Sequence, residues 1–168
     1  TQHYANAEQK FNVCVTKVTN SIVAASLSLH SKVAQVFLPT AVKFHYIFNL
    51  RDINNVYQGL LFSTNECLGT ASDVVRLWLH ESHRVYGDKF TDDKDIDAFT
   101  KMQTDIVKKS VEELDESVVF DKPNIFCHFS GGIGEPKYMP IPDWQTLTKL
   151  LQEAQVAYND IIAAMNLV

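Results

Sequence analysis

The first part of the chain carries apolar side chains at alternating steps of three and four residues, the spacing of one face of an α-helix. The positions that follow this spacing are Phe11, Val15, Val18, Ile22, Ala25, Leu29, Val33 and Val36. The pattern predicts an amphipathic helix from about Ala5 to Phe37. Pro39 ends it, because the residue before a proline avoids helical backbone angles.

Three shorter helices are predicted behind this one. The second runs from about Leu50 to Phe62, with an apolar face of Ile53, Val56, Tyr57, Leu60 and Leu61. Gly59 lies inside it and costs about 1 kcal/mol relative to alanine, so we expect close packing or a bend there. The third helix is capped by Ser72 or Asp73 and ends near Tyr86. The fourth starts near Thr91 or Asp92 and continues to about Glu116. Its apolar residues are sparse, so we expect a surface helix.

From Phe120 the pattern changes. Residues Asn124 to Phe129 are typical of a strand, and a flexible stretch of glycine and proline follows over residues 131–142. Asp143 then caps a last helix, which ends near Met165. We therefore predict a mainly α fold: a helical bundle over residues 1–118, a connector with a short strand and a Gly/Pro-rich loop over 119–142, and a separate helix over 143–168.

Charge and composition exclude several classes of partner. The net charge of −5 disfavours a nucleic-acid partner, and no apolar stretch is long enough to cross a membrane. The three cysteines lack a Cys-x-x-Cys spacing, which indicates reduced thiols in a cytosolic setting. The chain has no initiator methionine and ends on an apolar residue, so we expect a piece of a longer protein.

Three local patterns resemble known kinds of functional site. The histidines of His80-Glu81-Ser82-His83 are three apart, whereas a zincin needs them four apart, so surface histidines are the better interpretation. Cys127 and His128 are adjacent on the expected strand and point to opposite faces, which excludes a nucleophile–base pair. The loop 131–134 lacks the lysine of a P-loop and opens no helix, so we interpret it as a hinge or turn.

Arg51 is the strongest candidate for a functional residue. The aromatic run Phe44 to Phe48 is expected to be extended, either as a binding platform or, more simply, as a buried strand or core-entry segment. It ends at Asn49, a good N-cap, and Arg51 then falls in the first turn of a helix beside Asp52. The helix dipole disfavours a cation there unless an anion sits opposite, although a plain surface or salt-bridged arginine also fits.

The segment from Lys43 to Asp52, with Asn55 to Leu61 behind it, resembles the small helical lid of the third AAA+ module of an axonemal dynein heavy chain. The resemblance continues through further stretches and covers essentially the whole chain. These are Leu38 to Lys43, Leu61 to Thr64, Val75 to Glu81, Arg84 to Lys89, Asn124 to Phe129, Pro136 to Pro140 and Asp160 to Val168. It is closest to outer-arm heavy chains. It implies a AAA+ small-subdomain bundle, a connector, and the leading helix of the fourth module.

The resemblance implies functional residues as well. Arg51 matches the sensor-2 arginine, which reaches the phosphates of a nucleotide held by the large subdomain; Asn49, Leu50 and Asp52 lie beside it. Leu167 and Val168 would lie near the adenine pocket of the fourth module. ATP or ADP with Mg²⁺ is then a cofactor of the whole motor only, because residues 1–168 contain no Walker A or Walker B motif.

The resemblance also implies partners: the neighbouring AAA+ large subdomains of the same heavy chain, and the microtubule indirectly, in the cytoplasm or ciliary axoneme. A free-standing helical interaction module is the alternative, and a small enzyme is disfavoured because no complete catalytic set is present. A reading frame that continues beyond Val168 into a strand and a P-loop distinguishes the motor from the free-standing module.

Overall fold

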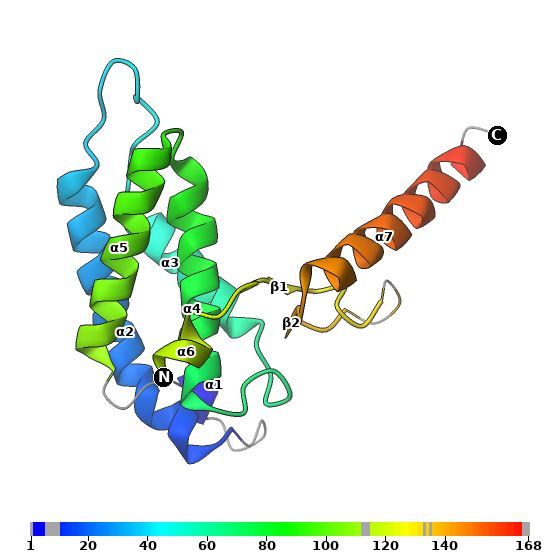
Figure 1. The fold of residues 1–168 in the computed structure, drawn as a ribbon, viewed down its shortest axis with the longest axis horizontal. Coiled ribbons are helices and arrows are strands. Elements are labelled where there is room, and N and C mark those ends of the chain that lie inside the picture. Colours follow the sequence, from blue (N-terminus) through cyan, green and yellow to red (C-terminus); the bar gives the residue numbers. More distant parts are fainter. Residues whose placement is uncertain (1, 6–10, 112–114, 133, 135, 166–168) are drawn as a thin grey trace. The chain divides into compact units, whose positions relative to one another are not determined.

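A computed structural model describes residues 2–5, 11–111, 115–132, 134 and 136–165 of the chain. Its helices are α1 Gln2–Ala5, α2 Val13–Val36, α3 Leu50–Leu61, α4 Ala71–Tyr86, the 3₁₀ helix η1 Gly87–Lys89, α5 Asp93–Ser110, α6 Glu116–Val119 and α7 Trp144–Met165, and its strands are β1 Phe126–Cys127 and β2 Met139–Pro140. The mainly α fold is thus confirmed (Figure 1). The chain forms two compact units, Thr1–Phe120 and Asp121–Val168. The finer division at residues 118 and 142 stays a prediction.

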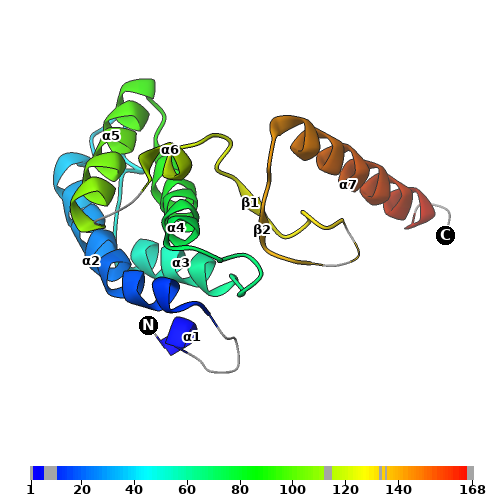
Figure 2. The same ribbon diagram turned by 60° about the horizontal axis from the view of Figure 1, so that its bottom comes forward.

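Helix α4 is the centre of the first unit and contacts α2, α3, α5 and α6. Figures 1 and 2 show α2, α4 and α5 side by side in both views. The buried side chains of α4 are Val74, Val75, Leu77, Trp78, Leu79, Glu81, Ser82, Val85 and Tyr86. The half-buried and exposed side chains, Arg76, His80, His83 and Arg84 among them, recur at steps of three and four and form one polar side, so α4 is amphipathic.

The predicted stripe of α2 is confirmed over most of its length. Val15, Ile22, Leu29 and Val33 are all buried. At the end of the helix Val36 is exposed and Phe37 is buried instead. The helix begins at Val13, so the predicted start near Ala5 is wrong. Ala5 is the last residue of the separate helix α1, and residues 6–10 lie outside the described part of the chain.

Helix α4 begins earlier than predicted, because its cap is Thr70 rather than Ser72 or Asp73. The Thr70 hydroxyl accepts from the backbone N–H of Asp73, and the Asp73 carboxylate accepts from the backbone N–H of Thr70. This reciprocal capping box satisfies two backbone donors at once. Asp73 therefore belongs to the cap, as predicted, but it is the third residue of the helix and not the N-cap.

Helix α5 ends at Ser110, six residues before the predicted end, because Val111 has extended backbone angles and a buried side chain. The short helix α6 was not predicted. It contacts α4, and Asp115 caps it by accepting from the backbone N–H of Ser117. The prediction that α5 is a surface helix is correct, since it buries only Phe99 and three further side chains.

In the second unit β1 pairs with β2 antiparallel, with Phe126 opposite Pro140 and Cys127 opposite Met139. The predicted strand over residues 124–129 is therefore too long, because regular pairing stops after two residues. Gly132 has a φ of 102°, which favours glycine, and the predicted turn is present at this residue. Asp143 caps α7 as predicted, by accepting from the Thr146 backbone N–H at 2.7 Å.

Among the helices described, none is long and apolar enough to span a membrane.

Candidate functional site

The first turn of α3 is held by a second capping box. The Asn49 side chain accepts from the backbone N–H of Arg51 at 2.9 Å, and the Asp52 carboxylate accepts from the backbone N–H of Asn49 at 2.9 Å. The prediction that Asn49 is the N-cap is confirmed. Because both side chains are used in the cap, the backbone direction at Arg51 is fixed locally.

The carboxylate of Asp52 forms an ion pair with Lys89. The Lys89 ammonium lies 2.6 Å from Asp52 Oδ1, and the Asp52 side chain is only 8% exposed. Lys89 also donates to the carbonyl oxygen of Ile47 at 3.3 Å and lies over the ring of Phe48, 5.1 Å from its centroid. The negative charge nearest to Arg51 in the sequence is therefore compensated by a different cation.

Arg51 itself is exposed. Within the described residues its guanidinium has no hydrogen bond or ion pair, as expected for neighbours one apart on a helix. Leu50, beside it, is 75% exposed. The structure thus brings Asn49, Leu50, Arg51 and Asp52 together at one helix end, with the apolar side chain and the cation open to solvent. Leu167 and Val168 lie outside the described residues.

The aromatic run before α3 is a turn, so the prediction of an extended segment is wrong. The backbone N–H of Tyr46 donates to the carbonyl oxygen of Lys43 at 3.2 Å. Long-range contacts impose this turn: the Lys43 ammonium lies 2.5 Å from both Asp92 and Asp95, and the Tyr46 hydroxyl donates to Asp95 at 2.8 Å. The Lys43 ammonium holds the pKa of Asp95 below its usual range. The alternative of a core-entry segment is correct for Tyr46, which is buried.

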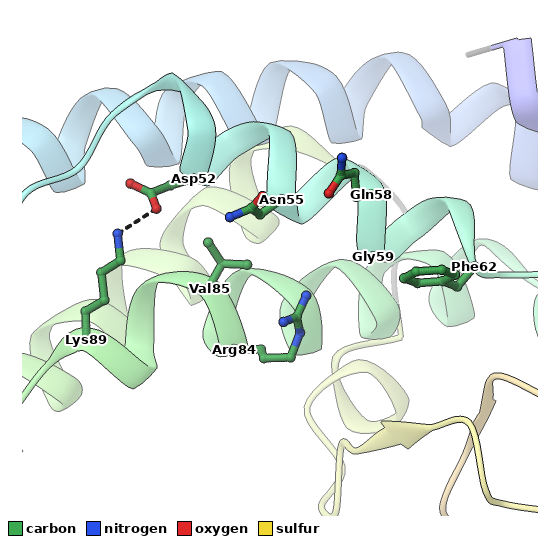
Figure 3. A pocket seen from close by; sticks show the side chains of 8 residues that line it. All are labelled: Asp52, Asn55, Gln58, Gly59, Phe62, Arg84, Val85 and Lys89. Atoms are coloured by element: carbon green, nitrogen blue, oxygen red, sulfur yellow. Dashed lines mark hydrogen bonds and ion pairs between the residues drawn. The ribbon is translucent and has the colours of Figure 1, made fainter.

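A hollow of about 350 Å³ lies between α3 and α4 (Figure 3). It is lined by Asp52, Asn55, Gln58, Gly59, Phe62, Arg84, Val85 and Lys89. Beneath Gly59 lies Glu81, which is 1% exposed and accepts from Arg84 at 2.7 and 3.1 Å. One feature of the sequence points to this buried carboxylate, namely a glycine in the middle of an amphipathic helix. The predicted close packing at Gly59 is confirmed.

The other patterns do not assemble into sites. Glu81 of the His80–His83 motif is buried against Arg84, and in the described ranges no group of three or more potential ligands could hold a metal ion. Cys127 is the last residue of β1 and is buried, whereas His128 follows the strand and is exposed.

The cysteines allow a direct test of the packing. Cys14 is exposed, whereas burial raises the pKa of Cys67 to about 12 and raises that of Cys127 above its usual range. We expect a thiol reagent at pH 8 to label one thiol rapidly and the other two only after denaturation, because the thiolate is the nucleophile. The rapid phase should vanish in Cys14→Ser; a second rapid thiol in that variant would contradict the fold.

Comparisons with known proteins agree with the mainly helical fold. A family model described as "AAA+ lid domain" matches residues 22–121. The chain is 53% identical over 167 residues to "Dynein beta chain, ciliary" of Tripneustes gratilla, and 50% identical over 168 residues to "Dynein axonemal heavy chain 17" of Homo sapiens. It is 42% identical over 164 residues to "Dynein alpha chain, flagellar outer arm" of Chlamydomonas reinhardtii. These matches cover 99%, 100% and 95% of the chain, which spans about 4% of the length of each relative.

Proposed function

This chain belongs to the AAA+ lid domain family, and we propose that it is the nucleotide-sensing lid of the third AAA+ module of a ciliary or flagellar dynein heavy chain. The residues after the lid would connect it to the fourth module. The similarity to axonemal heavy chains over nearly the whole chain supports this proposal, because it includes the lid and the segment behind it. In such a motor the lid would lie against large AAA+ subdomains of the same heavy chain and would act on the microtubule only indirectly.

The observation that carries the proposal is the state of Arg51. A cation in the first turn of a helix is disfavoured by the macrodipole by about 0.3–1 kcal/mol. Asp52, the acidic neighbour that could offset this, is buried and paired with Lys89. Within the described residues the guanidinium has no partner, so an external anion would satisfy both its charge and its hydrogen-bond donors. A phosphate group fits best, because the planar fork of arginine matches phosphate oxygens in a bidentate manner.

This arrangement would make the lid a sensor. A contact between Arg51 and a terminal phosphate exists only while that phosphate is present, so ATP and ADP would favour different lid positions. Movement of a rigid helical unit could then pass to the next module through the connector. Residues 1–168 contain no P-loop, so ATP or ADP with Mg²⁺ would be held mainly by the large subdomain, with Arg51 as an added contact.

Replacement of Arg51 by alanine in the intact heavy chain should weaken nucleotide binding at this module about ten- to a hundredfold. The reason is the loss of a hydrogen bond to a charged group, worth about 1.5–3 kcal/mol. The dissociation constant would be measured with a fluorescent nucleotide, after the P-loop lysines of other nucleotide-binding modules have been replaced. Arg51→Lys should restore part of the affinity, because lysine retains the charge but not the fork.

Lys101→Ala is the matched control, since Lys101 is an exposed cation on α5. It should leave the affinity unchanged, and both alanine variants should keep the stability of the lid within about 0.5 kcal/mol. A variant Arg51→Ala that destabilises the lid but binds nucleotide normally would make Arg51 a structural residue and would refute the proposal.

A further inference from the structure

Lys89 contacts the chain both before and after the point where α3 begins. It is the last residue of η1, and its ammonium reaches the carbonyl oxygen of Ile47 before the turn and Asp52 within α3. Figure 3 shows the pair with Asp52 at the edge of the hollow between α3 and α4. A single cation therefore ties the end of the aromatic turn to the beginning of the helix.

A continuous chain of hydrogen bonds connects Lys89 with the backbone of Arg51. Lys89 donates to Asp52 Oδ1 at 2.6 Å, and Asp52 Oδ2 accepts from the backbone N–H of Asn49 at 2.9 Å. The Asn49 side chain in turn accepts from the backbone N–H of Arg51 at 2.9 Å. Because Asp52 is buried, loss of Lys89 would leave an uncompensated carboxylate, which disfavours the conformation that caps the helix.

Lys89 is itself held in place from several directions. Nε2 of His45 lies 3.0 Å from its carbonyl oxygen, and the next residue, Phe90, packs its ring against those of Tyr46 and Phe48. The backbone N–H of Thr91 donates to the Tyr46 hydroxyl at 3.2 Å. The segment after α4 and the turn before α3 therefore form one connected structure, and the ammonium of Lys89 extends it into α3.

We propose that Lys89 is a positioning residue for Arg51. Lys89 would set the direction of the Arg51 guanidinium toward the nucleotide without touching the nucleotide itself. This inference rests on the proposed function of Arg51 and goes beyond it by adding a second residue to the sensor. Arg84 is a useful contrast: it lines the same hollow, but its ion pair goes to Glu81 on its own helix. The sensor would thus depend on one specific cation of the hollow rather than on its overall charge.

The test is a double-mutant cycle in the intact heavy chain, with nucleotide affinity at this module as the readout. Lys89→Met should weaken binding about three- to tenfold, and Lys89→Arg should restore most of the loss. If Lys89 acts only through Arg51, the double variant Arg51→Ala/Lys89→Met should bind no more weakly than Arg51→Ala alone. The control is Lys101→Met, because Lys101 is an exposed lysine on α5; this variant should bind nucleotide like the wild type.

Each outcome separates the two proposals. Additive losses in the double variant would mean that Lys89 acts independently of Arg51 and would overturn the positioning role. Normal binding by Lys89→Met with weakened binding by Arg51→Ala would overturn it too, while the proposed function stands. Normal binding by Arg51→Ala would remove the proposed function, and the positioning role with it.

A second variant protects the test against misfolding of Lys89→Met. In Asp52→Asn the amide oxygen can still accept from the Asn49 backbone N–H, while the ion pair with Lys89 is lost. The same non-additivity with Arg51→Ala is expected. Additivity here, or wild-type affinity for Asp52→Asn alone, would contradict the positioning role.

Discussion

Replacement of Trp78 by alanine is expected to lower the free energy of unfolding by about 3–5 kcal/mol, the usual range for a large buried aromatic side chain. Trp78 is 0% exposed and lies on α4, the helix at the centre of the first unit. Its indole N–H donates to the Ser26 hydroxyl at 2.8 Å, and that hydroxyl donates to the Ile22 carbonyl oxygen. The substitution therefore creates a cavity and removes a buried hydrogen bond between α4 and α2.

Urea unfolding of the 168-residue chain, followed by circular dichroism, would measure this loss. The chain offers a matched control in its other tryptophan, Trp144, which is 59% exposed on α7. Trp144→Ala should change the stability by no more than about 0.5 kcal/mol. Trp78→Phe should fall between the two, because it keeps a six-membered aromatic ring but loses the N–H donor and the rest of the indole, which leaves a smaller cavity than alanine does. Equal losses at the two tryptophans would contradict the assignment of α4 as the core helix.

Local patterns in the sequence were sufficient to predict much of the fold. The spacing from Val15 to Val33 predicts the buried face of α2, because a helix that must bury one face repeats apolar residues with its own period. The N-cap at Asn49 was predictable for a similar reason, since its hydrogen bond reaches only two residues along the chain. Such features depend on neighbours in sequence, and the sequence therefore displays them.

Features that depend on distant residues were not predictable in this way. The run Phe44 to Phe48 looks extended locally, yet it turns because Lys43 and Tyr46 bind Asp95, which lies about fifty residues further along the chain. Glu81 looks like a surface residue between two histidines, but the absence of a side chain at Gly59 makes room for its carboxylate.

The candidate site shows the same division. Its location in the first turn of α3 follows from the sequence, and the resemblance to a AAA+ lid implies a role for Arg51. The ion-pair partner of Asp52 could not be predicted from the sequence, because nothing near Asp52 indicates Lys89, which lies 37 residues away. Without that pair, the sequence could not show whether Asp52 would compete for Arg51 or be satisfied elsewhere.

The close contact of α3 and α4 at Gly59 leads to the second large effect. A Cβ atom at Gly59 would lie 1.9 Å from Glu81 Oε2, 2.2 Å from its Cδ and 2.8 Å from its Cγ. Rotation of the carboxylate alone cannot relieve this overlap, because three consecutive heavy atoms are involved. The whole side chain would have to move, and Glu81 is buried and paired with Arg84.

Gly59→Ala should therefore lower the free energy of unfolding by at least about 2 kcal/mol. Overpacking of a core typically costs about 1–3 kcal/mol, and displacement of the buried Glu81 carboxylate from Arg84 adds to that cost. They outweigh the gain in helix propensity, which is about 1 kcal/mol for alanine over glycine. Because α3 also carries Arg51, displacement of the helix should weaken nucleotide binding in the intact heavy chain as well.

The background of Glu81→Ala supplies the sharpest test, because it should reverse the sign of the effect. With the Glu81 side chain gone, the new methyl group at residue 59 has room, and only the propensity gain of about 1 kcal/mol remains. The double variant should therefore be more stable in urea than Glu81→Ala alone. Gly69→Ala is the matched control: its Cβ would lie 3.6 Å from Asp73, an ordinary contact, and its effect should stay within about 0.5 kcal/mol. If Gly59→Ala destabilised both backgrounds equally, the overlap with Glu81 would not be the cause, and the packing described for α3 against α4 would be wrong.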